Sequence, residues 1–527
     1  MWRSASWVGL AAACAAALQL RELVLDDVRT LTLRGRLIDD AFFYTIVARH
    51  MHATGVPSFD GEMTTNGLQP GWAALTLAAQ WLVAPGDSLP VMLGVSWALY
   101  ALFAGATLAY LWRRGPERGR AAAALLFAGL IALNPAYHWL SVRGLEMPLL
   151  LALAPLLLVQ VDRLAALGPA HTPPLGRVVT LALVAVALFF ARTDWFWIPI
   201  VCFAWVWWRG GARSGAAFAL VTALCVVPYL AANFALAGGL MPISGQVKQF
   251  YLARYTPDLG AWLASDESRG FVASFGKVLP LGRSGAWLVF PAFLAAGTYT
   301  VLRRRRLPAG LVVLAAASAL HLLFMHLGYR ELRPYTGYYF ALELVWLGLV
   351  AALALGELAG SRPRLALAVA ASLALAVSIR ALRDDRAAHA ERYHGARLEL
   401  ADDLRRIAPA GQRIAAFWPG ALSYFSGRDV IPLDGVIGSR AYFERYVREE
   451  RELDFAREHG VAYLAIQLPV SPEELRVRPD PPEIPGWGEL GTLRLWQNRD
   501  VAWRTVAARP FNERGAGWYL IELPWGR

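Results

Sequence analysis

Residues 38–51 read Ile-Asp-Asp-Ala-Phe-Phe-Tyr-Thr-Ile-Val-Ala-Arg-His-Met, and this stretch decides how the chain is organised. Phe43, Val47 and Met51 recur at helical spacing, which predicts an amphipathic helix lying at a membrane surface. Asp39 and Asp40 begin this helix, where the helix dipole favours negative charge. The two carboxylates could therefore be only a helix cap. They could equally supply a catalytic base and a neighbouring group that orients it or binds a metal ion.

The sequence around this stretch is that of an integral membrane protein. Of its 527 residues, 57% are hydrophobic and 17% are charged, whereas soluble proteins have about a quarter charged residues. Several apolar runs approach the ~20 residues that cross a bilayer. We expect about eleven transmembrane helices, near residues 5–25, 88–112, 121–138, 147–161, 178–192, 195–208, 215–237, 284–302, 308–327, 338–357 and 364–381.

The distribution of basic residues predicts the orientation of these spans. The net charge is +11, yet from residue 382 onward 21 Arg face 22 Asp and Glu. The surplus therefore lies in short loops of the membrane part, at Arg113 to Arg120, Arg209 and Arg213, Arg303 to Arg306, and Arg362 and Arg364. Such loops stay cytoplasmic. This pattern predicts a multi-pass protein of a bacterial inner membrane, with a cytoplasmic N-terminus, an extracytoplasmic C-terminus and no nucleic-acid partner.

Two further segments complete the predicted organisation. The run 71–84 follows Pro70 and is too short to cross, so we expect a re-entrant or interfacial helix. We assign residues 1–381 to the membrane domain and 382–527 to an extracytoplasmic α/β domain. Its buried strands are expected at Arg413–Trp418, Val430–Leu433, Val461–Gln467, Thr492–Gln497 and Gly517–Leu523. The stretch Arg440–His459 has helical spacing.

The predicted topology gathers ionisable residues on the outer face of the membrane. The acidic ones are Asp39, Asp40, Glu146, Asp194 and Glu331, and the basic ones are Arg143, Arg192, Lys248, Arg330 and Arg333. Ionisable groups at membrane boundaries are costly unless they are paired or functional. Ion pairs of Glu146 with Arg143 and of Asp194 with Arg192 would explain them without a function. Their gathering on one side also fits a single site that opens outward.

The Ile38–Met51 segment resembles the first outer loop of the GT-C glycosyltransferases, with Asp40 at the position of the essential acidic residue. A second block, Thr65-Asn-Gly-Leu-Gln-Pro-Gly-Trp72, is similar to a stretch of bacterial members, with Gln69 where a His is usual. Arg143–Met147, Ala191–Asp194 and Pro242–Lys248 resemble three further blocks. The chain is thus similar to arabinofuranosyltransferase and protein mannosyltransferase relatives within this superfamily.

The resemblance implies an inverting transfer of a sugar from a polyprenyl-phosphate donor to a hydroxyl of a glycan, lipid or protein acceptor. Asp40 would be the base and Asp39 its partner. Arg333, Lys248 and Arg330 would bind the donor phosphate, because cations stabilise that leaving group. Glu146, Arg143, Asp194 and Arg192 would form the second acidic motif. Asn66, Gln69 and Trp72 would form a substrate loop.

A divalent ion and two other functions remain open at this stage. Mg²⁺ or Mn²⁺ could bind Asp39 and Glu146, since hard cations prefer oxygen ligands. No organic cofactor is expected. A transporter or flippase of a lipid-linked glycan would place charged residues within the spans. A non-catalytic scaffold for envelope assembly would leave the outer acidic residues dispensable. The clustering of charges at the outer ends of the spans favours the enzyme.

Overall fold

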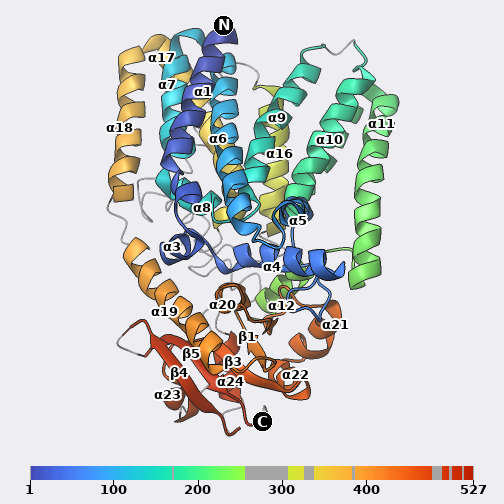
Figure 1. The fold of residues 1–527 in the computed structure, drawn as a ribbon. Coiled ribbons are helices and arrows are strands. Elements are labelled where there is room, and N and C mark those ends of the chain that lie inside the picture. The colour runs from blue at the N-terminus through green and yellow to red at the C-terminus, as the bar shows by residue number, and fades with distance from the viewer. Residues whose placement is uncertain are drawn as a thin grey trace.

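A computed structural model describes residues 2–168, 171–255, 307–325, 337–382, 386–477, 490–497, 501–512 and 515–525. Figure 1 shows a bundle of long helices with the N-terminus at one end and a smaller unit with a sheet at the other. We call the bundle end that contacts this smaller unit the domain-facing end. This arrangement confirms the predicted fold class, a polytopic helical protein with a C-terminal α/β domain.

The bundle consists of apolar helices that follow the predicted spans. They are α1 (Trp2–Gln19), α6 (Leu89–Arg114), α7 (Arg120–Phe127) with the π-helix η2 (Ala128–Ala132), α9 (Met147–Ala165), α10 (Leu175–Ala191), α11 (Trp197–Ala237), α16 (Ala309–Phe324), α17 (Ala341–Ser361) and α18 (Pro363–Leu382). Helices α6, α9, α11 with the residues just before it, and α17 are long and apolar enough to cross a membrane within the described residues. The predicted span at 284–302 lies outside the described residues.

Two details of the bundle follow from proline and glycine. The expected span 121–138 ends early at Ala132, because Pro135 cannot continue a helix and begins the short α8 (Pro135–Ser141) instead. Gly211 has a positive φ of 67° and breaks α11 into two halves. The rings of Phe203 and Phe218 lie 6.4 Å apart across this break, so the halves turn back on each other. The predicted spans 195–208 and 215–237 are these two halves.

Glycines also let the first two long helices approach closely. A Cβ on Gly9 would lie 2.8 Å from the Gly105 carbonyl oxygen, and a Cβ on Gly105 would lie 2.7 Å from the Gly9 oxygen. Small residues at such crossings are typical of helix packing in membranes, where close backbone approach replaces the hydrophobic effect. Helices α1 and α6 therefore pack side by side through close contact of their backbones at Gly9 and Gly105.

The basic loops that the structure describes gather at the end of the bundle that carries the N-terminus, and the loop at Arg303 to Arg306 lies outside the described residues. Arg114 forms an ion pair of 2.7 Å with Asp162 near the end of α9. Arg209 donates a hydrogen bond of 3.2 Å to the Ala165 carbonyl. Figure 1 shows that this end lies opposite the C-terminal unit. The charge asymmetry on which the predicted orientation rests is thus present in the folded chain.

Short helices form the domain-facing end. They are α2 (Glu22–Leu25), α3 (Val28–Leu33), α4 (Asp39–Thr54), α5 (Pro70–Val83) and α12 (Ile243–Tyr255). Helix α4 runs across the ends of the bundle helices, and α5 is seen nearly end on beside it (Figure 1). With 14 residues, α5 is about 21 Å long, too short to cross the ~30 Å hydrocarbon layer. This agrees with an interfacial or re-entrant helix.

The C-terminal unit contains one five-stranded mixed sheet with strand order β2-β1-β3-β5-β4. Its strands are β1 (Arg413–Ala416), β2 (Val430–Pro432), β3 (Val461–Leu468), β4 (Arg504–Pro510) and β5 (Gly517–Glu522). Strand β1 pairs in parallel with β2 and β3, and β5 pairs antiparallel with β3 and β4. Its helices are α19 (Arg386–Ile407), α20 (Pro419–Ser426), α21 (Arg440–Tyr442), the π-helix η6 (Phe443–Val447), α22 (Glu452–Glu458), α23 (Pro472–Val477) and α24 (Leu490–Gln497).

One prediction in this unit was wrong, and one strand was missed. The expected strand Thr492–Gln497 is helix α24, on which the buried Arg494 forms an ion pair of 2.6 Å with Glu452. The sequence of this segment does not reveal its long-range contact with Glu452. Strand β4 was not predicted, because it is an edge strand whose residues are mostly exposed and carry no apolar alternation.

The C-terminal unit packs directly on the domain-facing end. The ring of Phe42 on α4 lies 4.9 Å from Tyr424 and 5.5 Å from Phe425, both on α20. Ion pairs join Arg29 to Asp402 at 2.6 Å and, across the same face, Glu62 to Arg413 at 2.7 Å. Helix α4 is therefore enclosed between the bundle and the C-terminal unit.

Candidate active site

A polar cleft opens at the domain-facing end, between the bundle and helix α4. Its empty volume is about 830 Å³, part of which is open to solvent. The walls bring together the blocks that the sequence analysis singled out, namely Asp40, Gly67, Leu68, Gln69, Leu145, Glu146, Arg192, Thr193, Asp194, Pro242, Ser244, Gly245 and Lys248. Segments more than 200 residues apart thus form one site.

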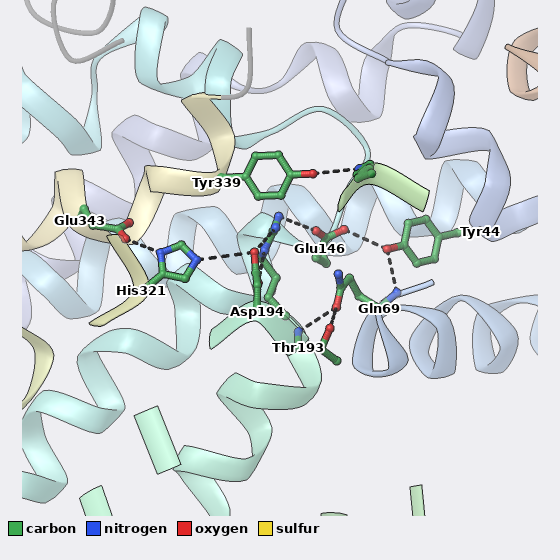
Figure 2. A network of polar contacts seen from close by, with 10 residues as sticks. Tyr44, Gln69, Glu146, Thr193, Asp194, His321, Tyr339 and Glu343 are labelled. Carbon is green, nitrogen blue, oxygen red and sulfur yellow. Dashed lines mark hydrogen bonds and ion pairs between the residues drawn. The ribbon is translucent and has the colours of Figure 1, made fainter. Parts of the chain in front are cut away.

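A buried network of charges forms the floor of this cleft (Figure 2). Arg192 is 2% exposed and lies between two carboxylates. Its Nη1 donates to Glu146 Oε1 at 2.9 Å, while its Nε and Nη2 donate to both oxygens of Asp194 at 3.0 and 2.5 Å. The bidentate geometry fixes the guanidinium plane. The expected Arg192–Asp194 pair is present, whereas Glu146 pairs with Arg192 instead of the expected Arg143.

The network extends into the bundle through residues that sequence reasoning did not assign to the site. His321 on α16 is fully buried and stacks on the Trp195 ring at 4.2 Å. Its Nε2 lies 3.7 Å from Asp194, and its Nδ1 lies 2.6 Å from Glu343 on α17. Nothing in the sequence pattern singled out His321. Only the packing of α16 against α17 and the start of α11 reveals its place.

Tyr44 and Gln69 form the opposite wall. The Tyr44 hydroxyl donates to Glu146 Oε2 at 3.0 Å and accepts from the Gln69 backbone N–H at 3.2 Å. The Gln69 Oε1 accepts from the Thr193 N–H at 2.8 Å and from its hydroxyl at 3.1 Å. Tyr44 lies four residues after Asp40, on the same face of α4, so helical spacing alone could have predicted its place in the site.

Lys248 supplies a cation from the other side of the cleft. Its ammonium donates a hydrogen bond of 2.8 Å to the hydroxyl of Tyr339, a residue that the sequence analysis did not assign to the site. The Tyr339 ring also lies 4.6 Å from the Arg192 guanidinium carbon. One aromatic ring therefore contacts both cations, which is a favourable cation–π arrangement.

The two consecutive aspartates face different surroundings. Asp40 is half-buried and lines the cleft, and its carboxylate has no hydrogen-bond or ion-pair partner among the described residues. Asp39 is buried, and its oxygens accept from the backbone N–H groups of Gly420 at 3.0 Å and Ala421 at 2.8 Å. The same carboxylate also pairs with Arg397. Asp39 therefore holds the C-terminal unit in place and does not line the cleft.

The remaining predicted residues have mixed positions. Asn66 accepts from the Ile243 N–H at 3.0 Å and so ties its loop to α12. Trp72 is 1% exposed and packs in the core, so it does not face a substrate. Arg143 places its guanidinium 4.2 Å from the Trp139 ring. Arg330 and Arg333 lie outside the described residues, so their assignment to a phosphate stays a prediction.

The described residues do not fit the expected metal site. They contain no group of three His, Cys, Asp or Glu side chains arranged to hold an ion. Both oxygens of Asp39 are occupied by backbone N–H groups, and both oxygens of Glu146 are occupied by Arg192 and Tyr44. A divalent cation needs several oxygen ligands that can turn toward it. We therefore assign no metal to Asp39 or Glu146.

Comparison with known proteins places this geometry in a structural class. No protein-family model and no curated protein sequence matches the chain. Its structure is similar to ArnT from Cupriavidus metallidurans bound to undecaprenyl phosphate, with a TM-score of 0.59, 13% identity, and coverage of 96% of this chain and 97% of that one. It is also similar to the oligosaccharyltransferase AglB from Archaeoglobus fulgidus, in complex with an inhibitory peptide and a dolichol-phosphate. That TM-score is 0.52 at 13% identity, over 89% of this chain and 70% of that one. The chain has the fold of the GT-C membrane glycosyltransferases.

Proposed function

We propose that the protein is an inverting glycosyltransferase that moves a sugar from a polyprenyl-phosphate donor to a hydroxyl acceptor. The observation that carries the proposal is the position of Asp40. A carboxylate without a partner among the described residues lines a cleft that also holds Lys248 and Arg192. The cleft lies where the bundle meets the C-terminal unit, and the two similar structures hold undecaprenyl phosphate and dolichol-phosphate.

The donor phosphate is best placed near Lys248. Arg192 lies between Glu146 and Asp194 in the floor of the cleft, whereas Lys248 lines the cleft and donates a hydrogen bond to the Tyr339 hydroxyl. An ammonium is a compact charge that suits a phosphate oxygen. The Glu146–Arg192–Asp194 network then acts as a rigid floor that keeps Lys248 and Tyr339 in position.

In the reaction, the acceptor hydroxyl attacks the anomeric carbon of the donor sugar from the face opposite the phosphate. The new C–O bond forms while the bond from that carbon to the phosphate oxygen breaks, and the polyprenyl phosphate leaves with the electron pair. Asp40 takes the proton of the acceptor hydroxyl, which a carboxylate within hydrogen-bond reach can do. No general acid is needed, because a phosphate is already a weak base.

We place the site on the extracytoplasmic side of a bacterial inner membrane. The basic loops gather at the opposite end of the bundle, and such loops stay cytoplasmic. A transporter would instead need its binding groups near the bilayer midplane. The described network from Glu146 to Glu343 lies near the domain-facing end, since Glu343 belongs to the first turn of α17. This position favours an enzyme.

The direct test is sugar transfer by the full chain in nanodiscs, with radiolabelled polyprenyl-phosphate sugars and envelope-derived acceptors. We expect Asp40→Asn to lower transfer by about 10²–10⁴-fold, the usual contribution of a general base. Binding of polyprenyl phosphate should persist. Asp402→Asn, which removes an exposed carboxylate of α19, is the matched control. Equal transfer by Asp40→Asn and wild type would remove Asp40 as the base. If the wild type showed neither sugar transfer nor binding of polyprenyl phosphate, the proposed function would be overturned.

A further inference from the structure

One buried carboxyl group outside the network described above has no explained role. Asp434 lies in the loop after β2 and is 3% exposed. Its Oδ1 accepts a hydrogen bond of 3.0 Å from the Val436 N–H, which is an ordinary turn contact. Its Oδ2 is buried, and no hydrogen-bond partner for it is found among the described residues. A turn alone would not require this second oxygen to be covered.

The loop that carries Asp434 forms part of the cleft wall. Val436 lines the cleft, and its carbonyl oxygen lies so near Gly67 that a Cβ there would come within 2.4 Å. A Cβ on Gly435 would lie 3.5 Å from the Val247 side chain, next to Lys248. Among the described residues, the charged groups Asp40 and Lys248 act on Asp434, and both line the cleft. Asp434 therefore lies directly behind the wall that faces the proposed base.

The nearby hydroxyl groups are engaged with other partners. Tyr442 donates to the Leu433 carbonyl at 2.9 Å, and Tyr251 donates to Glu452 at 3.3 Å. Both tyrosines interact electrostatically with Asp434 without a hydrogen bond to it. Burial, together with the negative charge of Asp40, raises the pKa of Asp434 to about 8. At pH 7 the carboxyl group is therefore protonated, and its O–H has no acceptor among the described residues.

A buried donor without an acceptor destabilises the folded chain, and such groups cluster at functional sites. We propose that Asp434 binds the acceptor substrate, donating a hydrogen bond to a sugar hydroxyl that neighbours the one activated by Asp40. This inference rests on the proposed function. A hydrogen bond donated to the attacking oxygen itself would withdraw electron density from the nucleophile. Two adjacent carboxyl groups therefore fit a saccharide acceptor, which presents two neighbouring hydroxyls.

Access to Asp434 requires a small movement of the loop. Its Oδ2 is covered in the ligand-free chain, so the acceptor has to displace the cleft-lining segment at Val436. Gly435, with a positive φ of 76°, and Gly438 flank this segment. Glycines give the backbone the freedom that such a movement needs.

The test compares Asp434→Ala and Asp434→Asn in the full chain in nanodiscs. Acceptor KM, kcat and polyprenyl-phosphate Kd are measured between pH 6 and 9. We expect Asp434→Ala to raise the acceptor KM about tenfold, the value of one lost hydrogen bond, with an unchanged Kd for the lipid phosphate. Asp434→Asn keeps a donor at this position and should bring the KM back to within about threefold of wild type.

The pH profile gives a readout that a structural role would not change. As the pH rises through about 8, Asp434 of the wild type loses its proton and gains a charge beside Asp40, so the acceptor KM should rise. This rise should be absent in Asp434→Asn. The matched control is Asp403→Asn, which removes a buried carboxylate of α19 that pairs with Arg509. It should leave the acceptor KM and its pH dependence unchanged.

Failure of this inference can be distinguished from failure of the proposed function. An acceptor KM of Asp434→Ala equal to that of wild type would overturn the inference. A combined rise in acceptor KM and lipid Kd with a fall in thermal stability would overturn it too, because it would indicate a structural role. Binding of methyl pentosides and hexosides without donor provides a second arm. If the wild type transfers no sugar but binds these saccharides, and Asp434→Ala does not bind them, then the proposed reaction fails while the acceptor site stands.

Discussion

Asp39 accepts a hydrogen bond of 2.8 Å from the backbone N–H of Ala421, a residue 382 positions later in the chain. This carboxylate caps helix α20 and so joins the first helix of the cleft to the C-terminal unit. The next residue, Asp40, points into the cleft. Consecutive helical residues differ by about 100° in direction, so the two carboxylates serve different surfaces.

Removal of the Asp39 charge should loosen the C-terminal unit. Asparagine cannot accept both N–H groups in the same way, and the buried Arg397 would lose its counter-charge. Breaking a buried pair costs about 3–5 kcal/mol. We expect Asp39→Asn to unfold at a lower temperature and to be cleaved faster by protease.

A control separates this role from catalysis. Asp402→Asn breaks the exposed Arg29–Asp402 pair, whose side chains are 45% and 46% exposed, so it should cost no more than about 1 kcal/mol. Equal stability of the two variants, with transfer lost only in Asp39→Asn, would show that Asp39 takes part in the chemistry after all.

Gln69 should be replaceable by another hydrogen-bond acceptor. Its Oε1 accepts from both the N–H and the hydroxyl of Thr193, next to Arg192. Gln69→Leu leaves the Thr193 N–H unpaired, at a cost of about 1–3 kcal/mol. Gln69→His can accept through a neutral ring nitrogen. We expect Gln69→His to retain transfer at pH 7.5 and lose it at pH 5.5, where the imidazole is protonated. Similar transfer by both variants at pH 7.5 would contradict this role.

Gly67 should tolerate no side chain. A Cβ there would lie 2.4 Å from the Val436 carbonyl oxygen, so the loop that carries Asp434 must move. Overpacking of this kind costs about 1–3 kcal/mol. Gly67→Ala should raise the acceptor KM and lower the unfolding temperature. Gly360→Ala is the control, because a Cβ on Gly360 in α17 meets nothing within 4 Å. The same acceptor KM for wild type, Gly67→Ala and Gly360→Ala would contradict the prediction that this contact shapes the cleft.

The stability of the docked C-terminal unit should depend on His50. Its Nε2 lies 3.3 Å from Asp429, and this carboxylate raises the pKa of His50. Because the pKa of His50 is higher in the folded than in the unfolded chain, its protonation stabilises the folded state. This stabilisation is fully present at pH values below the ordinary pKa of 6.5 and is lost as the pH rises through the raised pKa. Asp429 is 72% exposed, so the effect is at most about 1 kcal/mol.

The measurement is the unfolding temperature between pH 6 and 8.5, in an Asp434→Asn background that removes the titration of Asp434. We expect the unfolding temperature to fall with rising pH by about 1–3 °C less in His50→Gln than in the chain that keeps His50. An unchanged slope would mean that the His50–Asp429 pair does not couple pH to docking.

The sequence predicted the parts of the fold and the site that depend on local pattern. Apolar runs located the helices, and five short blocks, from Asp40 to Lys248, converge on one cleft. Helical spacing alone could not tell which of the two adjacent aspartates faces this cleft, because the answer depends on where α20 docks, and only the family resemblance pointed to Asp40. Tyr339 and Glu343 could not be found for the same reason, since only the packing of distant helices places them beside Arg192 and His321.

The cap on α20 also has a consequence for the order of events during biosynthesis. Asp39 leaves the ribosome 382 residues before its partner Ala421. At a synthesis rate of about 5–20 residues per second, roughly 20–75 s pass between the synthesis of helix α4 and that of helix α20, which packs on it. During that time Asp40 belongs to an open surface. The nascent chain therefore cannot assemble a finished cleft until the C-terminal unit has been made and has folded.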